Sequence, residues 1–333
     1  MTAIRIDPET LDPAQSQVQA KIFTQQHGGE VSDFFALLKP RVMSLVIFTA
    51  LVGMLVAKGS INPVIACVSL LSIAIGAGAS GCLNMWWDAD IDAIMTRTRL
   101  RPIPAGRMDA NTALAFGVAL SVGSVVVLGL VANLLSAALL AFTIFFYSVV
   151  YSMWLKRATP QNIVIGGAAG SFPPMIGEAV VTGHLGWDSL VLFGIIFIWT
   201  PPHFWALALV KSEDYARAGI PMLPNVAGPD VTRTHILVYS CILVPFALLP
   251  SMMGFGGVIY TITALVTGVI FMILALRIYK VREGREADKA AQNLFAYSIL
   301  YLLLLFVALL VEHGLNLFIQ LPTYLSALSR LLT

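Results

Sequence analysis

Three polar residues recur every four positions near the end of an apolar stretch: Asn84, Asp88 and Asp92. On a helix this spacing places them on one face, with neighbouring side chains about 6 Å apart. Like charges at that spacing repel each other unless a cation or a proton neutralises them. A hard divalent ion fits best, because Mg²⁺ takes one or two carboxylates and completes its shell with water and phosphate oxygens. The stripe is therefore a candidate Mg²⁺ site.

Arg97, Arg99 and Arg101 follow the stripe closely and could hold the phosphates of a metal-bound substrate. A simpler interpretation is that the acids mark a helix leaving a membrane, with the arginines as topology signals. The regular spacing on one face favours the functional interpretation. Trp86 and Trp87 lie beside the stripe, but they are equally typical of residues at a membrane interface.

The composition shows what kind of element carries this stripe. The chain has 333 residues, of which 58% are hydrophobic and only 11% charged, whereas soluble domains are about 25% charged. The apolar residues come in runs that can cross a hydrocarbon layer as helices. The sequence thus predicts an all-α, polytopic membrane protein. A net charge of +2, without a basic stripe, argues against nucleic-acid binding.

Nine apolar runs predict nine transmembrane helices. The fifth is the least regular, because its glycines and Pro173–Pro174 disfavour a helix. The runs lie at about 42–56, 63–83, 113–131, 134–153, 163–181, 190–209, 236–253, 258–276 and 294–311.

Positive charge predicts the orientation of these helices. If the N-terminus is cytoplasmic, 18 of the 20 Lys and Arg residues lie on the inner side, and only Lys58 and Arg330 lie outside. The two long inner loops, after the second and sixth runs, hold most of the acidic residues that could do chemistry. Residues 1–34 form a polar arm without the features of a signal or transit peptide. We expect a membrane domain at 35–312 and a short outer segment at 313–333.

Two segments carry a resemblance to a known family. Residues 84–92, NMWWDADID, followed by residues 95–102, MTRTRLRP, resemble the NxxxDxxxD signature of the intramembrane prenyltransferases. Residues 199–205, WTPPHFW, together with residues 214–224, DYARAGIPMLP, resemble the branch of that family that farnesylates haem. The resemblance covers residues 35–312.

This resemblance implies a fold and a reaction. The fold is a nine-helix bundle around a central cavity that opens to lipid and is capped by the two long inner loops. Farnesyl diphosphate, held through Mg²⁺, would donate its prenyl group to a vinyl group of haem b. The lack of an organelle-targeting segment in residues 1–34 favours a bacterial plasma membrane as the setting. Haem A synthase or oxidase assembly proteins would be the partners.

The resemblance also implies roles for residues. The second inner loop departs from the family's usual DxxxD pattern, and Asp214 is the fair metal candidate there. The resemblance implies Mg²⁺ ligation by Asn84, Asp88, Asp92 and Asp214, catalysis by Asp88 and Asp92, and substrate binding by Asn84, Arg97, Arg101, Tyr151, Lys156, His203 and Lys211.

Several of these positions also have structural interpretations. Tyr147 and Tyr151 share a helix face and either line the cavity or pack as aromatics. His203 would touch haem propionate, iron or diphosphate, or serve as a hydrogen-bonded structural residue. The small-residue run 74–81 predicts close packing of the second helix.

Two other functions remain open from the sequence. A transporter also uses intramembrane acids and broken helices, but its ionisable groups should lie near mid-bilayer rather than beside arginines at one end. Prenylation of an aromatic ring or a quinone precursor is the alternative within the enzyme class.

Overall fold

The computed structural model describes residues 28–318 and consists of helices with short connections. Residues 1–27 of the predicted arm and 319–333 of the predicted outer segment lie outside the described residues. The predicted boundary at residue 34 falls inside the first described helix. The elements are α2 (Val31–Leu37), α3 (Pro40–Val56), α4 (Pro63–Trp87), α5 (Ala89–Ile94), α6 (Ala110–Val131), α7 (Leu134–Phe145), the π-helix η2 (Phe146–Leu155), α8 (Lys156–Ala158), α9 (Asn162–Ser171), α10 (Pro173–Thr182), α11 (Trp187–Val210), α12 (Ser212–Arg217), α13 (Leu223–Val226), α14 (Pro229–Phe246), α15 (Leu249–Met252), α16 (Val258–Lys280) and α17 (Gly284–Gly314).

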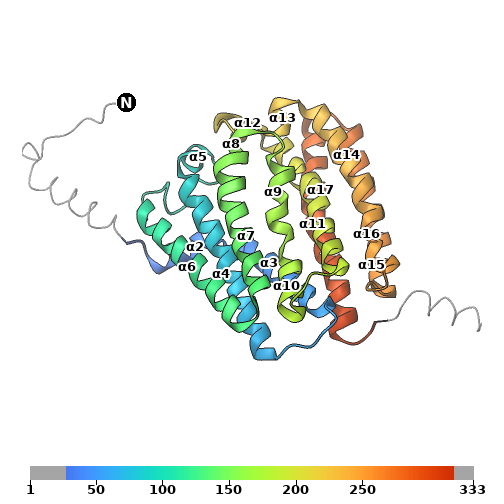
Figure 1. Cartoon of the computed structure of the whole chain (residues 1–333). Coiled ribbons are helices and arrows are strands. Elements are labelled where there is room, and N and C mark those ends of the chain that lie inside the picture. Colours follow the sequence, from blue (N-terminus) through green and yellow to red (C-terminus); the bar gives the residue numbers. More distant parts are fainter. Residues whose placement is uncertain (1–27, 319–333) are drawn as a thin grey trace, which may run out of the picture.

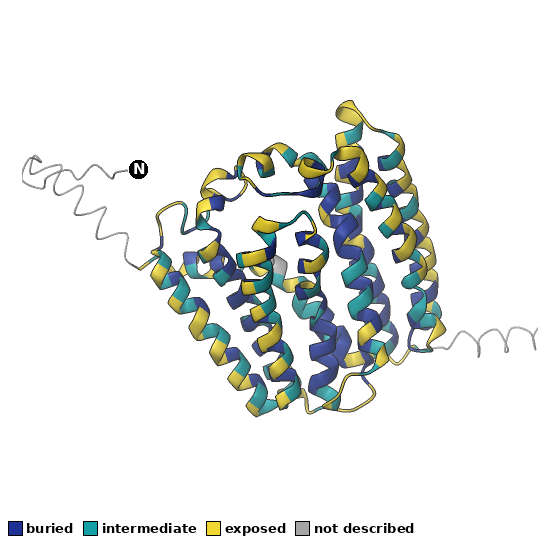
Figure 2. Ribbon diagram, turned by 45° about the horizontal axis from the view of Figure 1, so that its top comes forward, coloured by how far each residue is buried: buried dark blue, intermediate teal, exposed yellow. Residues whose placement is uncertain are grey.

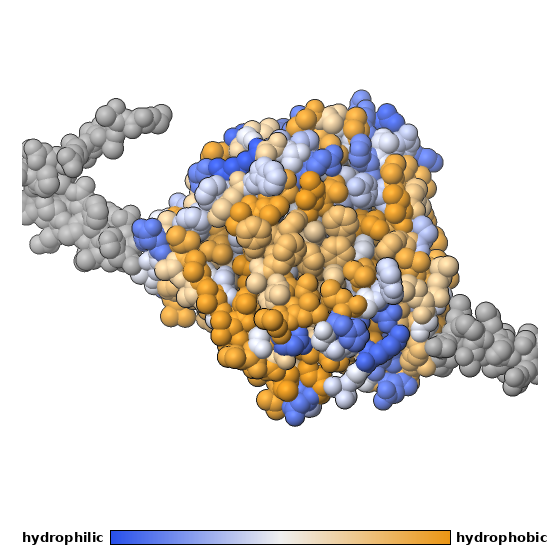
Figure 3. Space-filling model, viewed as in Figure 1, coloured by the Kyte–Doolittle hydropathy of each residue, from blue (hydrophilic) through white to orange (hydrophobic). Residues whose placement is uncertain are grey.

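Within residues 28–318, eight helical segments are long and apolar enough to cross a membrane, and Met43–Val56 of α3 is a shorter apolar helix. The eight segments fall on eight of the nine predicted runs, so the chain is a multi-pass membrane protein, and the span predicted at residues 42–56 stays a prediction. Figure 3 shows a broad hydrophobic band across the middle of the helices, with hydrophilic residues gathered toward the two ends.

Polar side chains at the N-cap position hydrogen-bond to the first turn of some of these helices. The Asn62 side chain accepts a hydrogen bond from the Val64 amide, and Asp109 accepts from the amides of Asn111 and Thr112. Such caps satisfy amide groups that have no partner within the helix. These two caps fix the first residue of α4 and of α6.

The fifth run is broken as expected, because α9 ends at Ser171 and Pro173 starts α10. This broken segment lies deep in the bundle: 67% of its apolar window is buried, against 17% for α6. Figure 2 shows buried residues gathered toward the centre of the bundle and exposed residues on the outward faces. Of the three cysteines, Cys82 is buried, whereas Cys67 and Cys241 are exposed.

Close packing of α10 on α3 depends on two glycines. A Cβ on Gly177 would lie 2.2 Å from the Ala50 carbonyl oxygen, and one on Gly53 would lie 2.3 Å from the Pro174 carbonyl oxygen. Real side chains do not tolerate such distances to backbone atoms, so the helices would have to separate.

We expect Gly177→Ala to destabilise the protein by about 1–3 kcal/mol, because the added methyl group overpacks the α3–α10 contact. The thermal midpoint in detergent measures this loss. Gly170→Ala is the matched control, because a Cβ on the helical, exposed Gly170 meets nothing within 4 Å. Equal stability of the Gly177→Ala protein and the control would contradict the packing argument.

Candidate active site

Asn84, Asp88 and Asp92 do lie on one continuous helical stripe. Asp88 ends α4 and begins α5, and the amides of Asp88 and Asp92 donate to the carbonyl oxygens of Asn84 and Asp88 at 3.0 and 2.8 Å. All three side chains are buried, with exposed fractions of 5%, 0% and 2% in sequence order. Carboxylates so buried need positive charge beside them.

Cations from other parts of the chain neutralise these carboxylates. Lys156 Nζ lies 2.5 Å from Asp88 Oδ2, and an Arg101 guanidinium nitrogen lies 2.6 Å from Asp92 Oδ2. Arg157 stands 3.7 Å from Asp88 Oδ1. The structure therefore joins the predicted stripe, the arginine loop and Lys156 into one cluster of opposite charges.

Asp88 has an unused oxygen inside this cluster. Its Oδ1 is buried and accepts no hydrogen bond from a described residue. An uncompensated carboxylate oxygen is costly inside a protein, and a bound cation would satisfy it. Within residues 28–318, no three His, Cys, Asp or Glu side chains form a cluster that could hold a metal by themselves. The donors present fit an ion that completes its shell with water and substrate oxygens, as Mg²⁺ does.

The second inner loop meets the first through Asp214. This buried carboxylate on α12 accepts from the Thr96 amide at 3.0 Å and from Arg217 at 2.6 Å. Burial raises the pKa of Asp214, but the Thr96 and Arg217 hydrogen bonds outweigh it and the pKa lies below its ordinary value. Figure 1 shows α5, α8, α12 and α13 gathered at one end of the bundle. Both loops therefore lie at the end where the stripe emerges.

The π-helix η2 positions the predicted Tyr151. Its ring stacks on Tyr147 with centroids 5.4 Å apart, and it occupies space that a Cβ on Gly166 of α9 would fill. The next residue, Ser152, donates to the Tyr147 carbonyl oxygen and accepts from Asn84 Nδ2 at 3.0 Å. Such wide helical turns are frequent at functional sites, and this one brings η2 against the stripe.

Two predicted residues of the loops lie further out. Arg97 is exposed and lies beside Tyr215, where it opposes the rise that burial causes in the Tyr215 pKa. Lys211, between α11 and α12, is exposed and forms no ion pair with any described residue. The structure brings Arg97 to the edge of the site but gives Lys211 no contact with the stripe.

His203 lies inside the bundle, apart from the charged cluster. Its ring stacks between Trp199 and Phe295, at centroid distances of 4.3 and 4.7 Å, and Nδ1 lies 2.6 Å from Ser298 Oγ. Ser298 Oγ donates its own proton to the Phe295 carbonyl oxygen. The hydrogen bond between Nδ1 and Ser298 Oγ orients the ring, and its direction depends on the ring tautomer.

Sequence reasoning missed two contributors. Lys39 Nζ donates to Asn84 Oδ1 at 2.7 Å, and Arg157 holds Asp90 through two hydrogen bonds of 2.9 and 2.8 Å. The sequence showed both only as positive charges at inner helix ends. Burial, with help from Arg101, lowers the pKa of Lys39 to about 7. That shift shows how strongly the surroundings of low polarity disfavour the charged form of Lys39.

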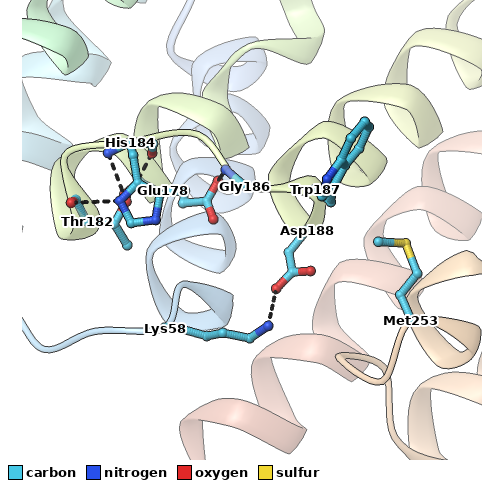
Figure 4. A pocket seen from close by; sticks show the side chains of 8 residues that line it. All are labelled: Lys58, Glu178, Thr182, His184, Gly186, Trp187, Asp188 and Met253. Carbon is cyan, nitrogen blue, oxygen red and sulfur yellow. Dashed lines mark hydrogen bonds and ion pairs between the residues drawn. The ribbon is translucent and has the colours of Figure 1, made fainter.

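A pocket of about 360 Å³ lies at the opposite end of the bundle (Figure 4). There Lys58 pairs with Asp188 at 3.3 Å, and Glu178 accepts from the Gly186 amide at 2.8 Å and from Ser189. Lys58 and Asp188 therefore neutralise each other. The two hydrogen bonds of Glu178 connect α10 to the start of α11.

The fold and this buried site define a prenyltransferase architecture. The model of the UbiA prenyltransferase family matches residues 46–300, so this chain belongs to that family. Among curated proteins, it is 67% identical over 309 residues to a protoheme IX farnesyltransferase of Methylobacterium sp. (strain 4-46), covering 93% of this chain and 96% of that protein. It is 68% identical to the enzyme of the same name in Methylorubrum extorquens, and the match covers 89% of this chain and 93% of that protein.

Solved structures confirm the fold at low sequence identity. A structure of digeranylgeranylglyceryl phosphate synthase matches with a TM-score of 0.71 at 15% identity, covering 85% of this chain and 98% of that chain. A UbiA homologue from Archaeoglobus fulgidus bound to DMAPP and Mg²⁺ matches with a TM-score of 0.62 at 16% identity. The match covers 84% of this chain and 99% of that chain.

Proposed function

We propose that this chain transfers the farnesyl group of farnesyl diphosphate to a vinyl group of haem b and so makes haem O. The observation that carries the proposal is the buried stripe whose two carboxylates are each paired with a cation from another segment. The relatives named protoheme IX farnesyltransferase, similar over almost their whole length, support haem as the acceptor.

Asn84, Asp88 and Asp92 would hold Mg²⁺, and Asp214 would serve a second ion on the facing loop. Asp88 Oδ1, which is buried and accepts no hydrogen bond from a described residue, is the atom best suited to a cation. When bound, Mg²⁺ supplies positive charge beside the diphosphate as that group leaves. Lys156 and Arg101 would then move from the carboxylates to phosphate oxygens. The exchange is favourable because the carboxylates would bind the metal ion while the two cations bind the diphosphate.

The reaction needs charge stabilisation rather than a nucleophilic side chain. The allylic C–O bond breaks with its electron pair on the diphosphate, where Lys156, Arg101 and Arg97 stabilise the developing charge. The vinyl π electrons of haem then form the new C–C bond. Water adds to the second cation and loses a proton, which gives the hydroxyethylfarnesyl substituent. Tyr151 and Tyr147 would flank the prenyl cation, since aromatic faces attract positive charge.

We assign His203 to the haem substrate rather than to the diphosphate. Its ring lies among aromatic side chains inside the bundle, apart from the carboxylates and cations of the stripe, so it is better placed for the haem macrocycle than for the diphosphate. Lys211 would contribute positive charge at the rim of the site.

We further propose that the N-terminus and both long loops face the cytoplasm of a bacterial plasma membrane. The distribution of Lys and Arg supports this orientation, with α3 as the first of nine spans. Farnesyl diphosphate and haem both partition to membranes, since burial of each CH₂ group gains about 0.8 kcal/mol. Haem A synthase or oxidase assembly proteins would receive the product.

A labelling experiment tests the acceptor. We expect purified protein with Mg²⁺ and radiolabelled farnesyl diphosphate to label haem b and to leave 4-hydroxybenzoate unlabelled. Chelation of divalent ions should stop the labelling, and added Mg²⁺ should restore it. Label on 4-hydroxybenzoate would instead identify an aromatic prenyltransferase, and transfer to neither acceptor would reject the proposed reaction.

A further inference from the structure

Lys39 reaches the stripe from outside the two acidic loops. It lies between α2 and α3, 45 residues before Asn84, and its Nζ donates to Asn84 Oδ1 at 2.7 Å. Its backbone is left-handed, with φ 50° and ψ 55°, which is unfavourable for a residue with a Cβ. Such strain persists where the surroundings require it and is concentrated at functional sites.

Helix α4 provides the room for this approach. A Cβ on Gly78 would lie 3.0 Å from the Leu38 side chain, and one on Gly81 would lie 3.3 Å from Lys39 Cδ. Both glycines belong to the small-residue run that precedes Asn84. The run therefore does more than pack helices, because it lets residues 38 and 39 lie directly against the stripe.

Lys39 is an unpaired cation of this site. Lys156 pairs with Asp88, Arg101 with Asp92 and Arg157 with Asp90. Lys39 forms no ion pair with a described carboxylate, and its hydrogen-bond acceptor is a neutral amide oxygen. A charge in low-polarity surroundings is stabilised when an anion arrives. The atom it occupies, Asn84 Oδ1, is also the oxygen that Asn84 would offer to a metal ion, so metal binding would free Nζ.

We infer that Lys39 is a further substrate-binding residue, whose ammonium group binds an anionic oxygen of a substrate once the site is loaded. This inference rests on the proposed function, which supplies two sources of such oxygens: the diphosphate of the prenyl donor and the carboxylates of haem. Lys39, between α2 and α3, and Lys156, at the start of α8, reach the Asn84–Asp88 pair from different segments, so they would bind the anion from two sides.

The test compares Lys39→Met, Lys39→Arg and the control Lys58→Met, an exposed lysine at the opposite end of the bundle. We expect Lys39→Met to raise the KM of one substrate by about 10- to 100-fold, as loss of a charge-assisted contact predicts. A rise for farnesyl diphosphate identifies the diphosphate as the bound anion, and a rise for haem b identifies its carboxylates. Lys39→Arg should recover part of the loss, and Lys58→Met should match the unmodified protein.

Thermal unfolding separates binding from a structural role. Without ligand, Lys39→Met should unfold at the same temperature as the unmodified protein or higher, because it removes an unpaired charge. Farnesyl thiodiphosphate with Mg²⁺, or haem b, should then stabilise the variant less than the unmodified protein. A variant that does not fold, or one with both KM values and both ligand-induced shifts unchanged, would overturn the inference. If the unmodified protein binds both ligands but makes no haem O, the proposed function fails, while this ligand comparison still decides the role of Lys39.

Discussion

Asp88→Asn should abolish prenyl transfer, with a fall in kcat of about 10³-fold or more, as expected when charge stabilisation of the leaving group is lost. The substitution keeps the shape of the side chain but removes the charge that pairs with Lys156. It also replaces one oxygen of a carboxylate whose Oδ1 accepts no hydrogen bond from a described residue. Product formation at saturating substrates measures kcat, and the Mg²⁺ concentration for half-maximal residual activity should also rise.

Asp90→Asn is the matched control for Asp88→Asn. Its carboxylate lies two residues away, is 64% exposed and pairs with Arg157. Arg157 holds the pKa of Asp90 below its ordinary value, so this pair is ionised at neutral pH. An exposed pair contributes little, so we expect activity within a few-fold of the unmodified protein. Near-normal turnover by folded Asp88→Asn protein would reject Asp88 as a metal ligand.

Lys156→Ala should raise the KM for farnesyl diphosphate by about 10- to 100-fold with a smaller fall in kcat, because the lysine acts as a point charge toward the phosphates. Its Nζ is the cation nearest to Asp88, and its side chain is 15% exposed. Steady-state kinetics with haem b held saturating measure the change.

Lys156→Arg helps to interpret that result, because it keeps the charge but replaces a compact ammonium with a planar group. We expect it to fall between Lys156→Ala and the unmodified protein. The KM for haem b should stay within a few-fold in both variants. An unchanged KM for farnesyl diphosphate in Lys156→Ala would show that the lysine neutralises Asp88 without binding the substrate.

The helices and the buried stripe of Asn84, Asp88 and Asp92 were predictable because both depend on short-range spacing. Runs of apolar residues predict helices in lipid, and positions 84, 88 and 92 share a face of any continuous helix. Pro173 likewise marks the break in the fifth run, since proline removes a helical hydrogen bond. These features depend on residues a few positions apart, so they do not require the packing to be known.

The partners of the stripe were less accessible to sequence reasoning. Lys39, Ser152 and Arg157 each look ordinary in sequence, as a loop lysine, a small polar residue and a topology charge. The π-helical turn that presents Ser152 to Asn84 leaves no periodic signal that an apolar pattern would reveal. The hydrogen-bond partner of His203, Ser298, likewise lies 95 residues away in the sequence.

By itself, the sequence determined the class of protein, the order of the apolar helices, and the face on which Asn84, Asp88 and Asp92 lie. The tertiary structure decided which donor meets which carboxylate. Lys156 binds Asp88 across 68 residues of sequence, and the Thr96 amide binds Asp214 across 118. Helical periodicity is set by local backbone geometry, so the spacing of residues in the sequence predicts which side chains share a face. Contacts between distant segments depend on how whole helices pack, and that packing follows from shape, glycine clearances and burial summed over the bundle.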